Sequence, residues 1–296
     1  MSEGEVRHMA EKRVLLGAHE SIAGGVEKAL ERGLEVGCDT VQIFVKTPNR
    51  WASRALEERD IVAFKKAVDE TRIWPVFAHS VYLINLATPD DTLWRKSVDA
   101  LTDDLQRCEQ LGLPGLVLHP GSHMGAGEEE GLSRIVAALD EIHTRLPGYE
   151  AQIWLEVTAG QGDQLGYTFE QLRAMIQRVK MPERLGVCFD TAHAFAAGYE
   201  LRSREGYEET WHQFQAVLGL DRLRAIHLND SKKGLGSRVD RHEHIGKGVL
   251  GLEPFRFLLN DPRFWGIPMT LETEKGPDLA EDKENLAVLR SLLEHT

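Results

Sequence analysis

Residues 185–193 read Leu-Gly-Val-Cys-Phe-Asp-Thr-Ala-His, and this stretch decides the fold. Its first five residues, Leu185–Phe189, form an apolar run with the length and composition of a buried strand in a parallel sheet. Asp190 and His193 follow that run directly. A carboxylate and an imidazole just beyond such a strand indicate chemistry at the carboxyl end of the sheet.

Seven further apolar or β-branched runs resemble this one, and each predicts a buried parallel strand. Segments with helical periodicity lie between them. The eight predicted strands are Val14–Gly17, Thr40–Val45, Ile73–Ala78, Gly115–Leu118, Ile153–Val157, Leu185–Phe189, Leu223–Leu228 and Pro268–Leu271. The helical segments include Ala55–Thr71, Leu93–Leu111, Leu132–Arg145, Thr168–Val179, Glu208–Leu218 and Pro254–Leu259.

This alternation, without a Pro/Gly/Ser-rich linker long enough to separate domains, favours one (β/α)8 barrel over an open doubly wound sheet. We therefore predict a single (β/α)8 TIM barrel over residues 13–296, with its active site at the carboxyl-terminal rim of the strands. Residues 1–12 are polar and acidic and are expected to form a flexible N-terminal arm.

Composition narrows the class of protein further. No apolar run reaches the roughly 18 residues of a membrane span, and the start does not resemble a signal peptide. A cytoplasmic monomer without an obligate protein partner is the expectation. The three cysteines lack the spacing of a thiolate zinc site or a disulfide framework. The net charge of -12 argues against a nucleic-acid partner, but three bound divalent cations would halve it.

Metal-binding residue types recur where the predicted strands end. Burying Glu156, Asp190 and Glu272 together at the mouth of a barrel is costly unless cations neutralise them. Imidazole with carboxylate suits zinc, manganese or iron, and the choice among these metals stays open. The full strand-end set is His19, His79, His119, Glu156, Asp190, His227 and Glu272.

Two local motifs extend this set. Asp190 and His193 stand at i and i+3, and Asp240 and His242 stand at i and i+2, so each pair can face one side. With six of the strand-end residues, they bring the potential ligands to nine, five histidines and four carboxylates. Nine ligands suit three ions, and a multi-metal cluster suits phosphodiester hydrolysis.

Longer motifs resemble those of a known family, bacterial endonuclease IV. The resemblance runs from about Gly17 to Thr273. Its segments are His119-Pro120-Gly121-Ser122-His123, Glu156 before Thr158-Ala159-Gly160-Gln161-Gly162, Asp190 to Gly198, His227-Leu228-Asn229-Asp230-Ser231-Lys232, and Gly236 to Gly246.

The resemblance implies three zinc ions per chain, with partial manganese or iron occupancy as an option. It assigns His79 and His119 to one ion, and Glu156 as a bridge to a second. Asp190, His227 and Glu272 complete the second site, and the third holds His193, Asp240 and His242. Glu156 and Glu272 are also the candidate catalytic residues, with ligation favoured for both and acid-base help from Glu272 as the lesser alternative.

The implied activity is DNA base-excision repair. The enzyme would hydrolyse the phosphodiester 5′ to an abasic site in double-stranded DNA by three-metal catalysis, and would trim blocked 3′ ends. Tyr82 would wedge into the duplex near the lesion. Lys232, Arg238 and Arg241 are expected to contact phosphates.

The sequence departs from the family pattern at two places. Asn49 stands where relatives commonly carry an inserting arginine, and Arg50 is the expected substitute. Val157 replaces an asparagine common after the bridging glutamate, which puts a hydrogen bond to a ligand in doubt.

The rival hypothesis is a metal-dependent sugar isomerase or epimerase on a xylose isomerase-like barrel. Such an enzyme needs one or two ions and no ligand role for Asp240 and His242.

Overall fold

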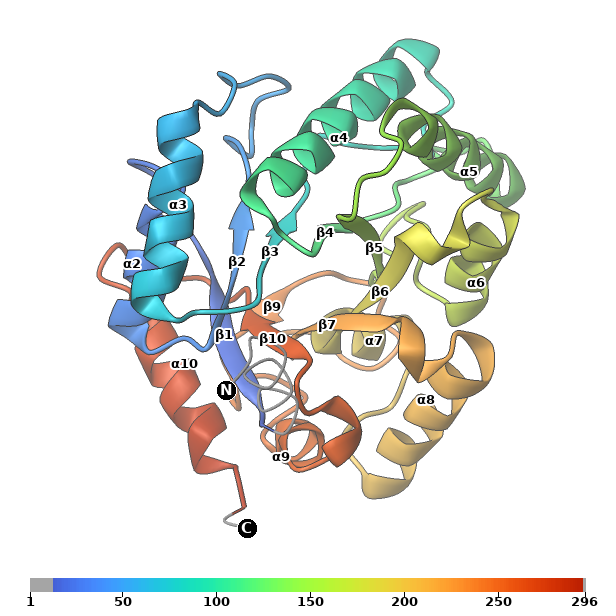
Figure 1. Ribbon diagram of the computed structural model, residues 1–296. Helices are drawn as coiled ribbons and strands as arrows, with labels where there is room; N and C mark the ends of the chain where they lie inside the picture. Colours follow the sequence, from blue (N-terminus) through green and yellow to red (C-terminus); the bar gives the residue numbers. More distant parts are fainter. Residues whose placement is uncertain (1–12, 295–296) are drawn as a thin grey trace.

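A computed structural model describes residues 13–294 of the chain, and the arm expected at 1–12 lies outside them. Eight parallel strands close into a barrel in the order β1-β10-β7-β6-β5-β4-β3-β2, which confirms the predicted (β/α)8 fold (Figure 1). The strands are β1 (Leu15–Glu20), β2 (Thr40–Phe44), β3 (Val76–His79), β4 (Gly115–Leu118), β5 (Gln152–Glu156), β6 (Leu185–Asp190), β7 (Leu223–His227) and β10 (Pro268–Leu271).

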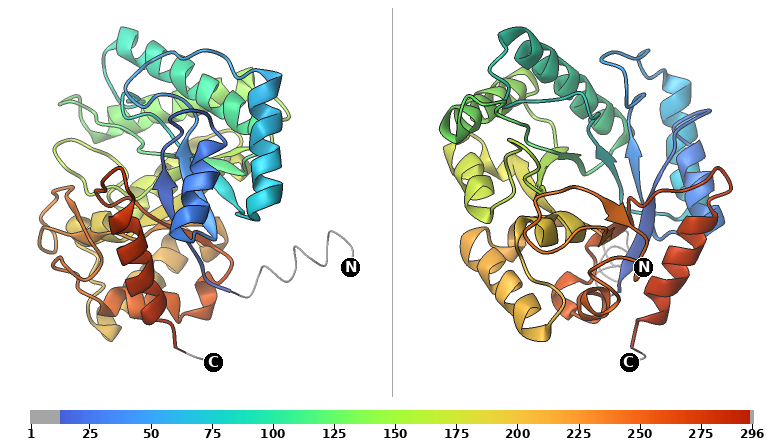
Figure 2. Two further views of the ribbon diagram at one scale, coloured as in Figure 1. Left: turned by 90° about the vertical axis from the view of Figure 1, so that its left-hand side faces the viewer. Right: turned by 180° about the vertical axis from the view of Figure 1, so that it is seen from behind.

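Helices surround this barrel in all three views (Figures 1 and 2). A two-stranded antiparallel sheet, β8 (Asp230–Ser231) with β9 (His242–Glu243), follows β7. The helices are α2 (Lys28–Val36), α3 (Glu58–Thr71), α4 (Asp91–Leu111), α5 (Glu128–Arg145), α6 (Phe169–Arg178), α7 (Thr191–Ala197), α8 (Arg204–Val217), α9 (Glu253–Leu259) and α10 (Ala280–Ser291), with short 3-10 turns η2 (Pro182–Arg184), η3 (Leu220–Arg222) and η4 (Pro262–Phe264).

Two strand boundaries differ from the prediction by three residues, and the other differences are of one residue. β3 begins at Val76 rather than at Ile73, and Pro75, which lacks the N–H that a strand ladder uses, directly precedes it. β1 extends to Glu20 rather than ending at Gly17, because residues 17–20 pair in register with residues 40–43 of β2. His19 therefore lies within a strand, beside β2.

The barrel interior below the rim is filled around the indole of Trp154. Gly115 and Gly186 make room for it, since a Cβ atom would come within 2.2 Å of the indole at Gly115 and within 2.8 Å at Gly186. This apolar layer takes one buried side chain from each of five neighbouring strands: Phe77, Val117, Trp154, Cys188 and Ala225.

The candidate site lies directly above this layer. Side chains two residues apart along a strand point the same way. Two residues beyond the members of the apolar layer come His79, His119, Glu156, Asp190 and His227, in the same strand order. The period of the strands therefore turns five candidate ligands toward the barrel axis, on an apolar floor.

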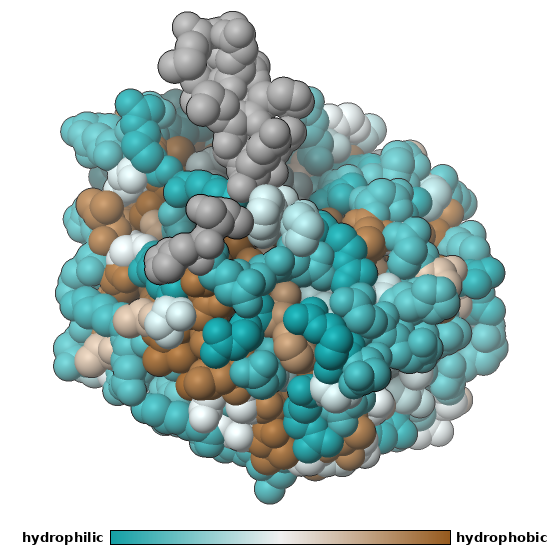
Figure 3. Space-filling model, turned by 90° about the horizontal axis from the view of Figure 1, so that it is seen from below, coloured by the Kyte–Doolittle hydropathy of each residue, from teal (hydrophilic) through white to brown (hydrophobic). Residues whose placement is uncertain are grey.

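Hydrophilic side chains cover most of the face seen from below, with hydrophobic residues exposed between them (Figure 3). Among residues 13–294, no helix combines the length and the apolar character that crossing a membrane requires.

Candidate metal centre

The predicted ligands form three groups at the rim of the barrel. Within each group, the ligand atoms lie within 4.8 Å of one another. Glu156 belongs to two groups, and so does Asp190. Asp240 joins the group of Asp190, His193 and His242, because its Oδ1 lies 3.1 Å from His193 Nε2. The structure thus brings all nine predicted residues together. The groups are His79, His119 and Glu156; Glu156, Asp190, His227 and Glu272; and Asp190, His193 and His242.

Glu156 lies at the centre of the cluster. Its Oε2 is 3.2 Å from His79 Nε2 and 3.0 Å from His119 Nε2. Its Oε1 is 3.1 Å from Nδ1 of both His193 and His227. The two carboxylate oxygens therefore face different pairs of imidazoles, which is the arrangement of a carboxylate that bridges two cations.

Asp190 uses its two oxygens for different purposes. Oδ1 caps α7 by accepting a hydrogen bond of 2.7 Å from the backbone N–H of His193. Oδ2 lies 3.7 Å from His227 Nδ1 and 3.6 Å from His242 Nε2. The i, i+3 motif is thus a helix cap followed by a first-turn histidine, and both side chains face the cluster.

The other end of α7 holds the loop that carries Asp240 and His242. The backbone N–H of Gly236 donates to Phe195 O at 3.1 Å, and that of Arg238 donates to Ala196 O at 2.9 Å. These bonds bring the segment back over α7, so that His242 Nε2 lies 3.3 Å from His193 Nε2.

Backbone carbonyls orient three of the histidines. His79 Nδ1 donates to Ser80 O at 2.7 Å, and His242 Nδ1 lies 3.4 Å from Glu272 O. His193 Nδ1 lies 3.1 Å from the backbone oxygen of Val157, so this contact does not depend on the Val157 side chain. Such bonds leave Nε2 of each ring for a metal.

The centre holds four carboxylates and no permanently charged cation among the predicted ligands. Burial alone would raise the pKa of Glu156 and of Glu272, yet neighbouring imidazoles hold both pKa values well below the usual range. Burial likewise opposes protonation of His193 and His227, but adjacent acidic groups raise the pKa of both rings.

Within residues 13–294, the four carboxylates pair only with histidines and with no lysine or arginine. Without a metal, protons on the imidazoles must balance the charge. Divalent cations would balance it while leaving the imidazoles neutral, as ligation requires. The residues therefore fit a cluster of divalent cations.

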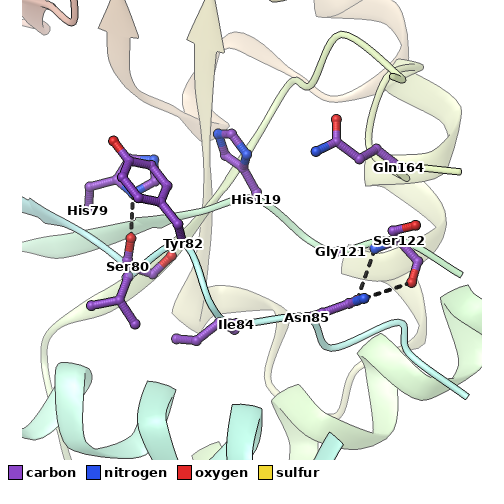
Figure 4. A pocket seen from close by; sticks show the side chains of 10 residues that line it. His79, Ser80, Tyr82, Ile84, Asn85, His119, Gly121, Ser122 and Gln164 are labelled. Atoms are coloured by element: carbon purple, nitrogen blue, oxygen red, sulfur yellow. Dashed lines mark hydrogen bonds between the residues drawn. The ribbon is translucent and has the colours of Figure 1, made fainter. Parts of the chain in front are cut away.

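A cavity of about 190 Å³ opens beside the cluster, lined by His79, His119, Tyr82 and Gln164 among others (Figure 4). Tyr82 is one of the lining residues, and it is 67% exposed (Figure 4). Its ring centroid is 5.2 Å from that of Phe44 and 6.1 Å from that of His79. A large, exposed aromatic side chain thus stands next to the candidate metal site.

Asn85 fixes the loop that carries Tyr82. Its Oδ1 accepts from the backbone N–H groups of Ser122 and Ala87 at 2.9 and 3.0 Å. Its Nδ2 donates to Ser122 O at 3.0 Å (Figure 4). The amide joins the loop after β3 to the loop after β4, a role that the sequence analysis did not assign.

The predicted DNA contacts lie at the surface around the cluster. Lys232 and Arg241 are exposed neighbours, since the Lys232 N–H donates to Arg241 O at 2.9 Å. Asn49 and Arg50 are exposed on the loop after β2. Arg238 is also exposed, but its guanidinium already has partners within the protein. It packs 3.9 Å from the Tyr167 ring centroid and donates to Gly160 O at 3.1 Å.

The fold and this site place the chain in a class of barrels. The family model described as "Xylose isomerase-like TIM barrel" matches residues 30–292. Over 277 residues the chain is 50% identical to "Probable endonuclease 4" of Trichlorobacter lovleyi, covering 94% of this chain and 99% of the relative. The chain therefore belongs to the endonuclease IV family, as its motifs predicted.

Solved structures agree with this assignment. The chain is similar to endonuclease IV from Thermus thermophilus, with a TM-score of 0.82, 37% identity, and coverage of 94% of this chain and 98% of that one. A D-tagatose 3-epimerase-like protein shares the fold with a TM-score of 0.69 at 20% identity, covering 94% of this chain and 98% of that chain.

Proposed function

We propose that the protein is a zinc-dependent apurinic/apyrimidinic endonuclease that hydrolyses the phosphodiester 5′ to abasic sites in double-stranded DNA. Trimming of blocked 3′ ends is proposed as a second activity of the same site. The observation that carries the proposal is the convergence of nine imidazole and carboxylate groups around the shared carboxylate of Glu156. The endonuclease relatives support it.

We infer that the three groups of ligands would form three zinc sites. His79 and His119 with one oxygen of Glu156 would hold the first ion. The other Glu156 oxygen would join the second ion, and His193, Asp240 and His242 would hold the third. When bound, the ions would supply an activated water and the positive charge that phosphodiester hydrolysis needs.

Burial separates the roles of the two glutamates. Glu156 is fully buried, so it serves as a ligand and does not reach substrate. The side chain of Glu272 is 16% exposed, and its Oε2 lies 3.1 Å from His227 Nδ1. Ligation is the main role of both residues, and proton transfer to or from the substrate is a secondary role open only to Glu272.

Recognition of the lesion would use exposed groups around the cluster. An abasic nucleotide has lost its pairing, so turning it out of the duplex costs least at the damage. Tyr82 would fill the space in the duplex, since its ring is exposed and its loop is held by Asn85. Lys232 and Arg241 would contact phosphates, and Arg50 would replace the usual inserting arginine, whose place Asn49 takes.

The sugar isomerase or epimerase hypothesis rests on the fold. The epimerase-like structures share the barrel at 20% identity or less, among them 3-keto-D-glucoside 4-epimerase. The contacts of Asp240 and His242 with His193 favour the nuclease, because a one- or two-ion isomerase needs no third group of ligands.

The decisive experiment uses the metal-loaded protein and a duplex oligonucleotide with one tetrahydrofuran abasic analogue. We expect incision on the 5′ side of the analogue, and none after treatment with a chelator. Elemental analysis should find three zinc ions per chain. Absence of incision by protein that holds its metal would refute the nuclease.

A substitution tests the bridging role. Glu156→Gln keeps the size of the side chain and removes the charge shared by the first two sites, so incision should fall at least about 10³-fold while the circular-dichroism spectrum stays native. Retained turnover would show that Glu156 is not the bridge.

A further inference from the structure

Gln42 is a fully buried polar side chain in the apolar run of β2. It lies beside β1 and β3, and its register partner on β1 is His19. No role was predicted for Gln42 from the sequence. A buried amide at this level of the barrel must have hydrogen-bond partners, and those partners indicate its structural role.

The partners are three side chains at the rim. Gln42 Nε2 lies 2.6 Å from Glu272 Oε1 and 2.8 Å from His19 Nδ1. Gln42 Oε1 lies 2.7 Å from His227 Nε2. An ionised carboxylate only accepts hydrogen bonds, so the NH₂ group must face Glu272 and the amide oxygen must face His227.

This orientation determines the proton position on His227. Because the amide oxygen only accepts, His227 Nε2 carries the hydrogen and donates it. In the neutral ring, Nδ1 then presents its lone pair, and Nδ1 is the atom 3.1 Å from both Glu156 Oε1 and Glu272 Oε2. His79, His193 and His242 take their orientation from backbone carbonyls, whereas His227 takes it from this side chain.

The same amide accounts for His19. The second N–H of Gln42 points to His19 Nδ1, so that nitrogen is an acceptor already engaged by the amide. His19 stood among the strand-end candidates, but it belongs to none of the three ligand groups. It supports Gln42 from β1.

We propose that Gln42 is a positioning residue for the second metal site, the group of Glu156, Asp190, His227 and Glu272. It holds His227 in the tautomer that can bind a metal through Nδ1, and it aims the second oxygen of Glu272 at the same point. The inference rests on the proposed metal-dependent function. Partners of this kind commonly change metal affinity 10- to 100-fold when they are lost.

The test compares Gln42→Met, which keeps the side-chain length but removes all three hydrogen bonds, with Gln42→Asn, which withdraws the amide by one methylene. Thr40→Val is the matched control, because Thr40 is buried on the same strand and bonds Pro75 O rather than a ligand. Zinc per chain and competition with a graded chelator are measured for each protein, beside kcat and KM on the abasic duplex.

We expect one of three ions to be held about 10- to 100-fold more weakly in Gln42→Met, with a smaller loss in Gln42→Asn and none in Thr40→Val. The kcat should fall at subsaturating zinc with KM nearly unchanged, and excess zinc should restore it. Native-like melting of the chelated variants checks folding.

Wild-type zinc retention in both Gln42 variants would overturn the inference. Weakened zinc binding in the variants, when neither they nor the wild type incise the duplex, would support the positioning role while refuting the nuclease. The two hypotheses therefore fail separately.

Discussion

The metal centre and the ion cluster around Lys46 both bury carboxylates, but they balance charge differently. Lys46 Nζ lies 2.9 Å from Asp104 Oδ1 and 3.2 Å from Asp103 Oδ2, and Arg107 Nε lies 3.0 Å from Asp103 Oδ1. Two carboxylates there meet two permanent cations. Among residues 13–294, the ion-pair partners of the four carboxylates of the metal centre are all imidazoles, which are cations only when protonated.

The difference separates a structural cluster from a binding site. Lys46 also donates to Ala100 O at 2.9 Å, and Arg107 donates to Arg54 O at 2.9 Å. The balanced cluster therefore ties the loop after β2, with Asn49 and Arg50, to α4. Buried acidic groups that exceed the permanent cations around them instead mark a place where ions from solution are bound.

The largest expected effect is removal of metal. Each ion held at a free concentration 100-fold above its Kd adds about 2.7 kcal/mol to the free energy of unfolding, so three ions add about 8 kcal/mol. Chelation should lower the unfolding free energy by that order in urea titrations. If the chelator-treated protein were as stable as the loaded one, the proposed difference between the metal centre and the Lys46 cluster would be refuted.

Lys46→Met should cost about 3–5 kcal/mol of stability, because it leaves Asp104 buried without its cation. Since Lys46 shares no partner with the metal ligands, the loss should be equal in loaded and chelated protein. The double variant Lys46→Met, Asp104→Leu should recover much of it. A cost that disappears on chelation would show that the two clusters are coupled.

A smaller effect is a pH dependence confined to the Lys46 cluster. Burial, opposed by Lys46, raises the pKa of Asp104 to about 6, above the value of about 3.9 in unfolded chains. Its contribution to stability is therefore complete below about pH 4 and is lost as pH rises through about 6. Relative to wild type, chelated Asp104→Asn should gain about 1 kcal/mol between pH 5 and 7.5. A difference in unfolding free energy that does not change with pH would contradict this.

The smallest effect concerns exposed cations outside both clusters. Arg241→Ala should weaken binding to the duplex. It should also reduce the slope of the logarithm of the binding constant against the logarithm of the salt concentration by about one. Arg238→Ala is the comparison, because that guanidinium already packs on Tyr167 and bonds Gly160 O. Its loss should change the salt slope less. Equal slopes for both variants would assign Arg238 to phosphate as well.

The strands and the ligands could be predicted because one physical rule governs both. Parallel strands buried on both faces are apolar throughout, so a histidine or carboxylate at their end is conspicuous. For this reason the structure brings together the six of the nine predicted residues that stand at strand ends. Asp240 and His242 do not follow a barrel strand, and they were predicted from their i, i+2 spacing and from the motif Gly236 to Gly246.

Residues that act through side-chain partners escaped prediction. Gln42 sits between Val41 and Ile43, and a polar residue inside a buried strand was the available signal. Asn229 donates to Asp190 Oδ2 at 2.7 Å and accepts from the Glu272 N–H at 2.9 Å, yet those partners lie 39 and 43 residues away. Such pairings arise only when the barrel closes. The predicted start of β3 was wrong because β-branched Ile73 resembles a strand residue, whereas the strand begins only after Pro75.

Helix α7 gives the cluster a mechanical coupling. Its cap, Asp190, contributes to two ligand groups, its first turn supplies His193, and its last carbonyls hold the segment that carries Asp240 and His242. This helix of seven residues thus connects the second and third ligand groups. If both groups bind metal, an ion in one group would steady α7 for the other, so the two ions should load cooperatively.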